Sequence, residues 1–254
     1  MRVEQYPVCH VNTARSKASV EHTNQVFYDR LWSSARLVEP ERFNTWPIVS
    51  ELAAESGQRL EVGPGLRPRL PIKDTHFADI SEPALNALAS CGGKTHQAGV
   101  GRLPFADASF DLVCALDIIE HVADDFGAIS ELARVSRPGA IILLSTPLHP
   151  EYWTPFDEIV GHYRRYPPQK LLELLERHGI AVERSAVFGM KPRSSWLLDL
   201  GMWFLKHHPR TAMRFYNRLF MPLALKRQQD LVLTEGLIDT DGVDEVFLIC
   251  RAGS

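Results

Sequence analysis

The chain has 254 residues, with 28 lysines and arginines against 31 aspartates and glutamates, and a formal net charge of −3. This length suits one large α/β domain that carries an appendage. The slight excess of acid argues against a nucleic-acid partner, which needs surplus positive charge on one face. The four cysteines include no Cys-x-x-Cys pair, so their spacing suggests neither a zinc knuckle nor a disulfide framework.

Residues 1–56 precede the first predicted strand. Residues 1–17 show no periodicity and predict a loose arm, whereas the apolar spacing of 20–37 and 48–56 predicts two helices that cover the sheet. The first 30 residues lack the apolar segment of a secretion signal, and no apolar run reaches the length of a membrane span. A cytoplasmic protein is therefore expected.

From residue 57 onward, strand-like runs alternate with segments of helical spacing. This alternation predicts a Rossmann-like, doubly wound and mostly parallel sheet of seven strands, whose ligands bind beyond the carboxyl ends of the strands. Pro68 and Pro71 disfavour a full helix between the first two strands. The predicted strands are 59–62, 75–79, 95–98, 110–116, 140–146, 180–188 and 245–250.

Residues 190–242 form a long insertion between the sixth and seventh strands, and its composition predicts mostly helix. Apolar side chains from Trp196 to Leu205 surround a helix on nearly every side, so this helix must be buried. Three alternatives stay open: a lid over a partly apolar acceptor pocket, a homodimer contact, and, least favoured, a membrane contact. The row Arg210, Arg214 and Arg218 most often means a solvated face.

The first strand ends in a glycine turn, Glu61-Val-Gly-Pro-Gly65, where a bound molecule can approach the backbone closely. Asp79 follows 18 residues after Glu61, where a carboxylate can accept hydrogen bonds from ribose hydroxyls; the alternative is a helix cap. A dinucleotide fingerprint requires a small residue where Pro68 stands. A cofactor without phosphates is therefore favoured.

Six motifs in order resemble the class I S-adenosylmethionine-dependent methyltransferases, in the small-molecule, type 11 subgroup. The resemblance covers about residues 57–188 and implies a methyltransferase domain over 57–254. Arg67 replaces the third glycine of the family, and Gly99 replaces the family's adenine-binding aspartate. The motifs are Leu60–Gly65, Ala78–Ser81, Leu103–Phe105, Phe110–Val113, Glu120–Val122 and Arg134–Gly139.

The resemblance implies that S-adenosyl-L-methionine is bound and S-adenosyl-L-homocysteine is released. It places the glycine turn at the methionine part of the cofactor and Asp79 at the ribose. Adenine would be held by an apolar face and by backbone groups. The implied contacts are Glu61, Gly63, Pro64 and Gly65 for methionine, Ile80, Gly99, Val100 and Leu103 for adenine, and Leu116 and Asp117 beside the methionine end.

Methyl transfer to a hydroxyl or amine needs a destination for a proton, and histidine is the usual acceptor. His121, His149 and His162 follow predicted strands on the ligand side and are the candidate bases. Residues 163–166, Tyr-Arg-Arg-Tyr, either bind an acidic acceptor or form a loop clamped on the sheet. No metal is expected, because Asp157, Glu158 and His162 lack the spacing of a ligand set.

Two functional hypotheses follow. The first is an enzyme that methylates a small organic acceptor at oxygen, nitrogen or carbon. The second is a non-catalytic module that binds S-adenosylmethionine and uses the insertion to contact a protein or a membrane. The same fold serves many chemistries, so the sequence does not identify the acceptor.

Overall fold

The computed structural model describes residues 35–189, 204, 207–208, 211–212 and 215–253. The predicted arm, most of the helix at 20–37 and the Trp196 segment lie outside these residues. Among the helices of the described residues, none is long and apolar enough to cross a bilayer.

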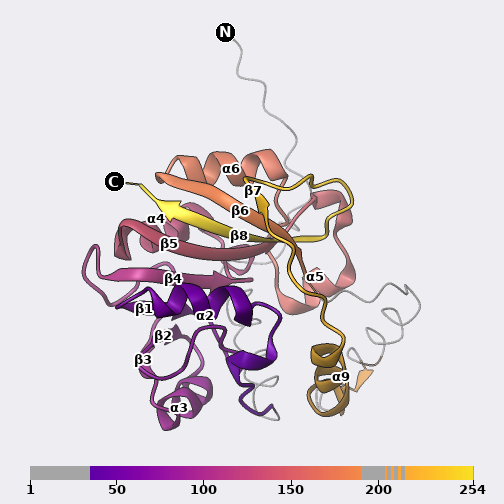
Figure 1. The fold of residues 1–254 in the computed structure, drawn as a ribbon. Coiled ribbons are helices and arrows are strands. Elements are labelled where there is room, and N and C mark those ends of the chain that lie inside the picture. Colours follow the sequence, from indigo (N-terminus) through magenta and orange to yellow (C-terminus); the bar gives the residue numbers. More distant parts are fainter. Residues whose placement is uncertain (1–34, 190–203, 205–206, 209–210, 213–214, 254) are drawn as a thin grey trace.

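Eight strands form one sheet in the order β3-β2-β1-β4-β5-β8-β6-β7 (Figure 1). The first five strands in this order, from β3 through β2, β1 and β4 to β5, run parallel to one another, whereas β8 runs antiparallel to both β5 and β6. The doubly wound, mostly parallel prediction is therefore confirmed. The strands are β1 (Arg59–Val62), β2 (His76–Asp79), β3 (Lys94–Gln97), β4 (Phe110–Leu116), β5 (Ser136–Pro147), β6 (Ile180–Phe188), β7 (Thr234–Glu235) and β8 (Glu245–Ala252).

The prediction of seven strands missed β7, which lies inside the stretch 190–242 that was expected to be mostly helical. This strand is two residues long and pairs with Arg184 and Ser185 of β6. Ser185 also fixes the chain beyond it, because its Oγ donates to the Gly236 carbonyl and accepts the Ile238 N–H. Two exposed residues carry no alternating pattern, so only the tertiary contacts reveal this strand.

The helices described in the remaining chain are short. Asp124 caps α4 by accepting the Gly127 N–H at 2.9 Å. No helix lies between β1 and β2, as Pro68 and Pro71 predicted. The helical elements are η1 (Pro40–Arg42), α2 (Trp46–Ala54), α3 (Glu82–Ser90), η2 (Ile119–His121), α4 (Asp125–Val135), η3 (Pro150–Tyr152), α5 (Pro155–Val160), α6 (Pro168–Glu176), the π-helix η4 (Tyr216–Phe220) and α9 (Met221–Lys226).

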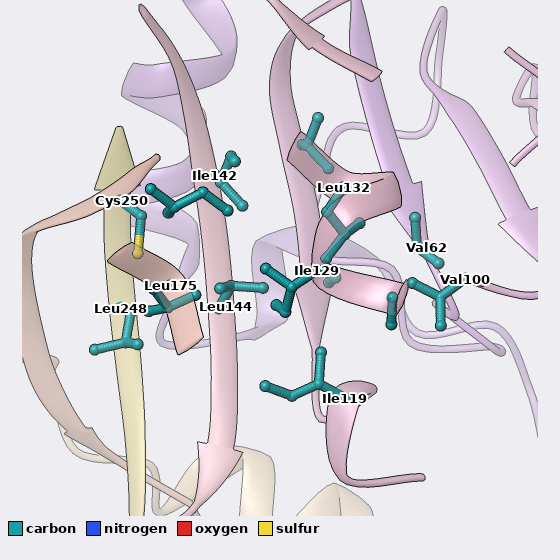
Figure 2. Close-up of a cluster of buried hydrophobic side chains, with 14 of the residues drawn as sticks. Val62, Val100, Ile119, Ile129, Leu132, Ile142, Leu144, Leu175, Leu248 and Cys250 are labelled. Atoms are coloured by element: carbon teal, nitrogen blue, oxygen red, sulfur yellow. The ribbon is translucent and has the colours of Figure 1, made fainter. Parts of the chain in front are cut away.

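Side chains of the central strands alternate between two apolar layers, as the period of two in a strand requires. Figure 2 shows part of the larger layer, where Ile129 and Leu132 of α4 and Leu175 of α6 pack against β5 and β8. The smaller layer, on the other face, packs Val49 and Ala53 of α2 over β4, β5 and β8. The prediction that N-terminal helices cover the sheet is confirmed for α2.

Candidate functional site

The order of the strands reverses between β1 and β4, which are parallel neighbours. The chain continues from β1 to one side and from β4 to the other, so the carboxyl ends of these two strands mark the topological switch point, where ligands usually bind in this architecture. Gly63 lies at this point with a φ of 67°, and a Cβ there would lie 2.2 Å from Cδ1 of Ile118. Only glycine permits this contact between the turn after β1 and the loop after β4.

Asp79 ties the glycine turn to the end of β2. Its Oδ2 accepts the Gly65 N–H at 2.8 Å and its Oδ1 accepts the Ser81 N–H at 2.8 Å. Ser81, not Asp79, is the residue before α3, so Asp79 supports the start of this helix through the Ser81 N–H without being its cap. An ionised carboxylate can accept hydrogen bonds from several donors at once, and a contact with ribose hydroxyls stays a prediction.

An exposed apolar side chain follows Asp79 at the carboxyl end of β2. Ile80 is 44% exposed, and a Cβ at Gly99 would lie 3.8 Å from its Cγ2. Val100 and Leu103 are buried in the larger core layer, and the Leu103 N–H and carbonyl already bond Glu131 and Arg134, so an adenine contact for these two residues stays a prediction. Ile80 therefore fits the expected adenine face, and Gly99 leaves space beside it.

The Glu61 side chain points to the smaller apolar layer. It holds the connection between β1 and β2, which contains no helix. Its carboxylate accepts the N–H groups of Arg69 at 2.9 Å and Leu70 at 3.0 Å. Burial raises the pKa of Glu61 to about 7, against the lowering effect of these two backbone bonds and of the Arg69 charge. Pro64 is also buried, and its carbonyl accepts the Arg67 N–H at 2.9 Å. A methionine contact for Glu61 and Pro64 stays a prediction.

Asp117 follows Leu116, at the end of β4, and adopts a φ of 55°. Its N–H donates to the Ser145 carbonyl at 3.1 Å, and its Oδ1 accepts the Ser145 hydroxyl at 2.5 Å. These bonds fix a carboxylate between β4 and β5, next to the point where the strand order reverses. The position suits the predicted place at the methionine end, and the contact itself stays a prediction.

Two further carboxylates lie near Asp117 and were not among the predicted site residues. Glu120 is 1% exposed and accepts the Thr146 hydroxyl at 3.3 Å, and Glu245 begins β8. Burial, followed by the charge of Asp117, raises the pKa of both groups well above its usual range. The antiparallel direction of the last strand is the signal that was missed for Glu245, because such a strand starts at the edge where parallel strands end.

Two of the three predicted histidines meet. The rings of His121 and His162 lie edge to face, 4.5 Å apart at an angle of 78°. Burial, and then the neighbouring His162, lower the pKa of His121 well below its usual range. His162 Nδ1 lies 2.8 Å from Asp157 Oδ1, so the imidazole donates its Nδ1 proton to a buried carboxylate.

His149 lies among different partners. Its Nε2 is 2.8 Å from the Thr240 carbonyl, which can only accept, so this nitrogen carries a proton. Its ring packs against Tyr152 at 4.9 Å, and its φ is 59°. These contacts hold the loop after β5 against residue 240. Each of the three histidines stays a candidate base until it is tested.

The loop 163–166 is clamped on the sheet, which was one of its two predicted roles. Arg165 is buried and forms ion pairs with Asp157 at 2.8 Å and Asp244 at 3.0 Å. The Tyr166 hydroxyl donates to Asp125 Oδ2 at 2.9 Å. Burial raises the pKa of Asp157, but hydrogen bonds from His162 and Arg165 outweigh it and hold this pKa well below its usual range. Arg165 is thereby committed to internal ion pairs.

The reversal of strand order at β1 and β4, the glycine turn and the acid after β2 are the features by which Rossmann-like folds bind a cofactor that contains a ribose. Comparison with known proteins narrows this class. The family model described as "Methyltransferase domain" (Methyltransf_11) matches residues 61–144. These residues belong to a class I S-adenosylmethionine-dependent methyltransferase domain of the type 11 kind.

Sequence relatives cover only part of the chain. A probable S-adenosylmethionine-dependent methyltransferase of Mycolicibacterium smegmatis is 40% identical over 88 residues, which are 33% of this chain and 34% of the relative. An O-methyltransferase of Aspergillus sclerotiorum is 32% identical over 159 residues, 54% of this chain and 60% of that one. The chain thus spans at most about three fifths of these relatives.

Solved structures share the fold over more of the chain. The crystal structure of the [4+2]-cyclase SpnF has a TM-score of 0.57 at 16% identity and covers 94% of this chain and 97% of its own. A likeness at this level of identity concerns the fold alone. The acceptor must be argued from the site itself.

Proposed function

We propose that this chain transfers a methyl group from S-adenosylmethionine to a small organic acceptor at oxygen, nitrogen or carbon. The observation that carries the proposal is Asp79, whose carboxylate holds both the glycine turn through Gly65 and the start of α3 through Ser81. This places a pre-oriented acceptor of hydrogen bonds at the reversal of strand order, where a ribose binds in folds of this type.

The geometry of the neighbouring residues supports a cofactor without phosphates. Ile80 offers an exposed apolar face, Gly99 leaves space next to it, and the crossover after the turn has no helix whose N-terminus would hold a pyrophosphate. Asp117 lies at the end of β4, the strand next to the turn. Adenine, ribose and methionine would then follow one another along the carboxyl ends of β3, β2, β1 and β4.

S-adenosylmethionine supplies an electrophilic methyl group on a positively charged sulfur. A lone pair of the acceptor bonds to the methyl carbon as the carbon–sulfur bond breaks, and that bond's electron pair stays on sulfur. For a hydroxyl or amine, the proton that is lost passes to a basic group of the site. The protein contributes positioning, exclusion of water and this proton acceptor.

Oxygen is the acceptor atom that the site favours. Carboxylates of Asp117, Glu120 and Glu245 lie together at the proposed acceptor end, where they can accept a hydroxyl proton. The relative from Aspergillus sclerotiorum carries the name of an O-methyltransferase, which supports the same choice. A partly apolar phenol or enol is the acceptor class to test first.

The decisive experiment measures S-adenosylhomocysteine formed from S-adenosylmethionine with a panel of phenols, enols and amines. The expected result is release that depends on both protein and acceptor, lowered at least about tenfold in Asp79→Asn at limiting cofactor. Binding of S-adenosylhomocysteine without turnover on any acceptor would favour the non-catalytic module. Absence of binding by calorimetry would overturn the cofactor assignment.

A further inference from the structure

We propose that Glu120, His121 and His162 bind one divalent first-row transition metal ion at the acceptor end of the site. One ligand atom from each residue lies within 4.8 Å of the others. Two imidazoles and one carboxylate form a known catalytic set for such ions and leave positions open for substrate oxygens. The sequence gives no hint of this set, because His162 is separated from the Glu-His pair by about forty residues.

The first support is a buried carboxylate oxygen. Glu120 is 1% exposed, and its Oε1 has no hydrogen-bond partner among the residues that the structure describes. Its Oε2 has one bond to Thr146, at 3.3 Å. A buried polar atom without a partner costs about 1–3 kcal/mol, more if charged, and proteins rarely retain one without a purpose. A cation shared with the two histidines would satisfy it.

The second support is how the imidazoles are held. His162 donates its Nδ1 proton to Asp157 at 2.8 Å, which leaves Nε2 with its lone pair. His121 has the backbone of Gly161 as a hydrogen-bond partner. Metal-binding histidines typically have such a partner, a carboxylate or a backbone carbonyl, that fixes the tautomer and the ring orientation. Asp157 is itself fixed by Arg165, at 2.8 Å.

Another histidine pair provides a contrast. His76 Nδ1 and His96 Nε2 lie 3.1 Å apart, and their rings stack at 11°. In this pair the two nitrogens hydrogen-bond each other, so their lone pairs do not converge on a third point. His121 and His162 instead meet edge to face, with a carboxylate beside them. Bonds of about 2.1 Å would need these three ligand atoms to close to roughly 3.4 Å, a change that side-chain rotations can supply.

The ion would sit beside Asp117, at the proposed methionine end. An acceptor with two adjacent oxygens could use the open positions, and the ion would lower the pKa of a coordinated hydroxyl so that its proton leaves before the oxygen bonds to the methyl carbon. This use of the ion rests on the proposed methyl transfer. Binding of the ion does not, and it can be measured without cofactor or acceptor.

The test uses the full chain without a histidine tag, treated with a chelator and titrated with Zn²⁺ and Co²⁺. We expect one ion per chain by calorimetry, visible absorption from Co²⁺, and loss of affinity by about 100-fold or more in Glu120→Gln and in His162→Gln. His149→Gln and the double variant His76→Gln, His96→Gln are matched controls and should bind as the native chain does.

Native protein that binds neither ion, or binding that is lost in the His76/His96 control instead, would overturn the site. The native titration decides this even if a ligand variant fails to fold. Equal turnover of chelated and ion-loaded protein would overturn the role of the ion in methyl transfer and leave that transfer intact. One bound ion without S-adenosylhomocysteine from any acceptor would count against methyl transfer alone.

Discussion

The carboxylates at the carboxyl edge of the sheet differ in their hydrogen-bond partners between the two halves of that edge. In the cofactor half, formed by β1 and β2, the carboxylates of Asp79 and Glu61 each accept two backbone N–H groups. In the acceptor half, formed by β4, β5 and β8, one oxygen each of Glu120 and Glu245 has no partner among the described residues. Backbone groups thus hold the acids of the first half, whereas each of these two acids of the second half keeps one oxygen for a molecule or ion that binds.

This difference has a physical reason. S-adenosylmethionine is the same molecule in every turnover, so backbone groups can hold its site in one geometry. A buried group that lacks a partner keeps its full interaction energy for the molecule or ion that arrives. Changes at four residues test this difference between the two halves.

Asp79→Ala should weaken S-adenosylhomocysteine binding by roughly 2–4 kcal/mol, because it removes the ribose contact and releases the Gly65 and Ser81 N–H groups together. Calorimetry measures this loss. The affinity of Asp79→Asn should lie between those of the native chain and Asp79→Ala, because asparagine keeps one acceptor oxygen. Asp107→Ala is the control, since Asp107 is exposed and its ion-pair partner is Arg134, far from the glycine turn in sequence. Unchanged affinity in a folded Asp79→Ala protein would remove Asp79 from the cofactor site.

Glu61 should make stability fall with rising pH. Its folded pKa of about 7 lies above the ordinary 4.5, so the folded state holds the proton more tightly. This stabilisation of about 3 kcal/mol is full below pH 4.5 and is lost as pH rises through 7. Urea unfolding of the native chain and of Glu61→Gln from pH 4.5 to 8 checks it. Parallel curves for the two proteins would show that Glu61 does not titrate in this range.

Gly63→Ala should lower the free energy of unfolding by about 2 kcal/mol more than Gly139→Ala. Both glycines have a positive φ, 67° and 77°, so both variants acquire backbone strain of about 1 kcal/mol. A Cβ at Gly63 also meets Ile118 at 2.2 Å, whereas one at Gly139 meets nothing within 4 Å. Denaturant unfolding measures the free energy of unfolding of both variants. Equal losses would mean that Ile118 moves aside freely.

His149→Gln should change turnover by less than about threefold, because the Nε2 of His149 is occupied by the Thr240 carbonyl. A histidine that acted as the general base would cost about 100-fold when replaced. Steady-state rates of S-adenosylhomocysteine formation compare this variant with His162→Gln. A loss of about 100-fold in His149→Gln, without a loss in His162→Gln, would instead make His149, in the loop after β5, the proton acceptor.

Local patterns were sufficient to predict most strands of the sheet. Strand-like runs predicted β1, β4 and β6 with their observed bounds, and two prolines predicted the crossover without a helix. The prediction missed strand β7 because two exposed residues cannot show an alternating apolar pattern, and the pairing of this strand depends on Ser185. In the site, motif order pointed to Asp79 and its glycine turn. The Glu120, His121 and His162 set depends on a contact between distant segments, which one sequence does not encode locally.

The position of β8 has a consequence for synthesis on the ribosome. Strand β8, at residues 245–252, lies between β5 and β6, and β6 pairs with no other described strand except the two-residue β7. The edge of β5 must therefore stay unpaired until β8 has been made. An open strand edge attracts foreign strands. The nascent protein is thus prone to misassociation throughout the synthesis of the segment between β5 and β8, and the pairing of β8 ends that period.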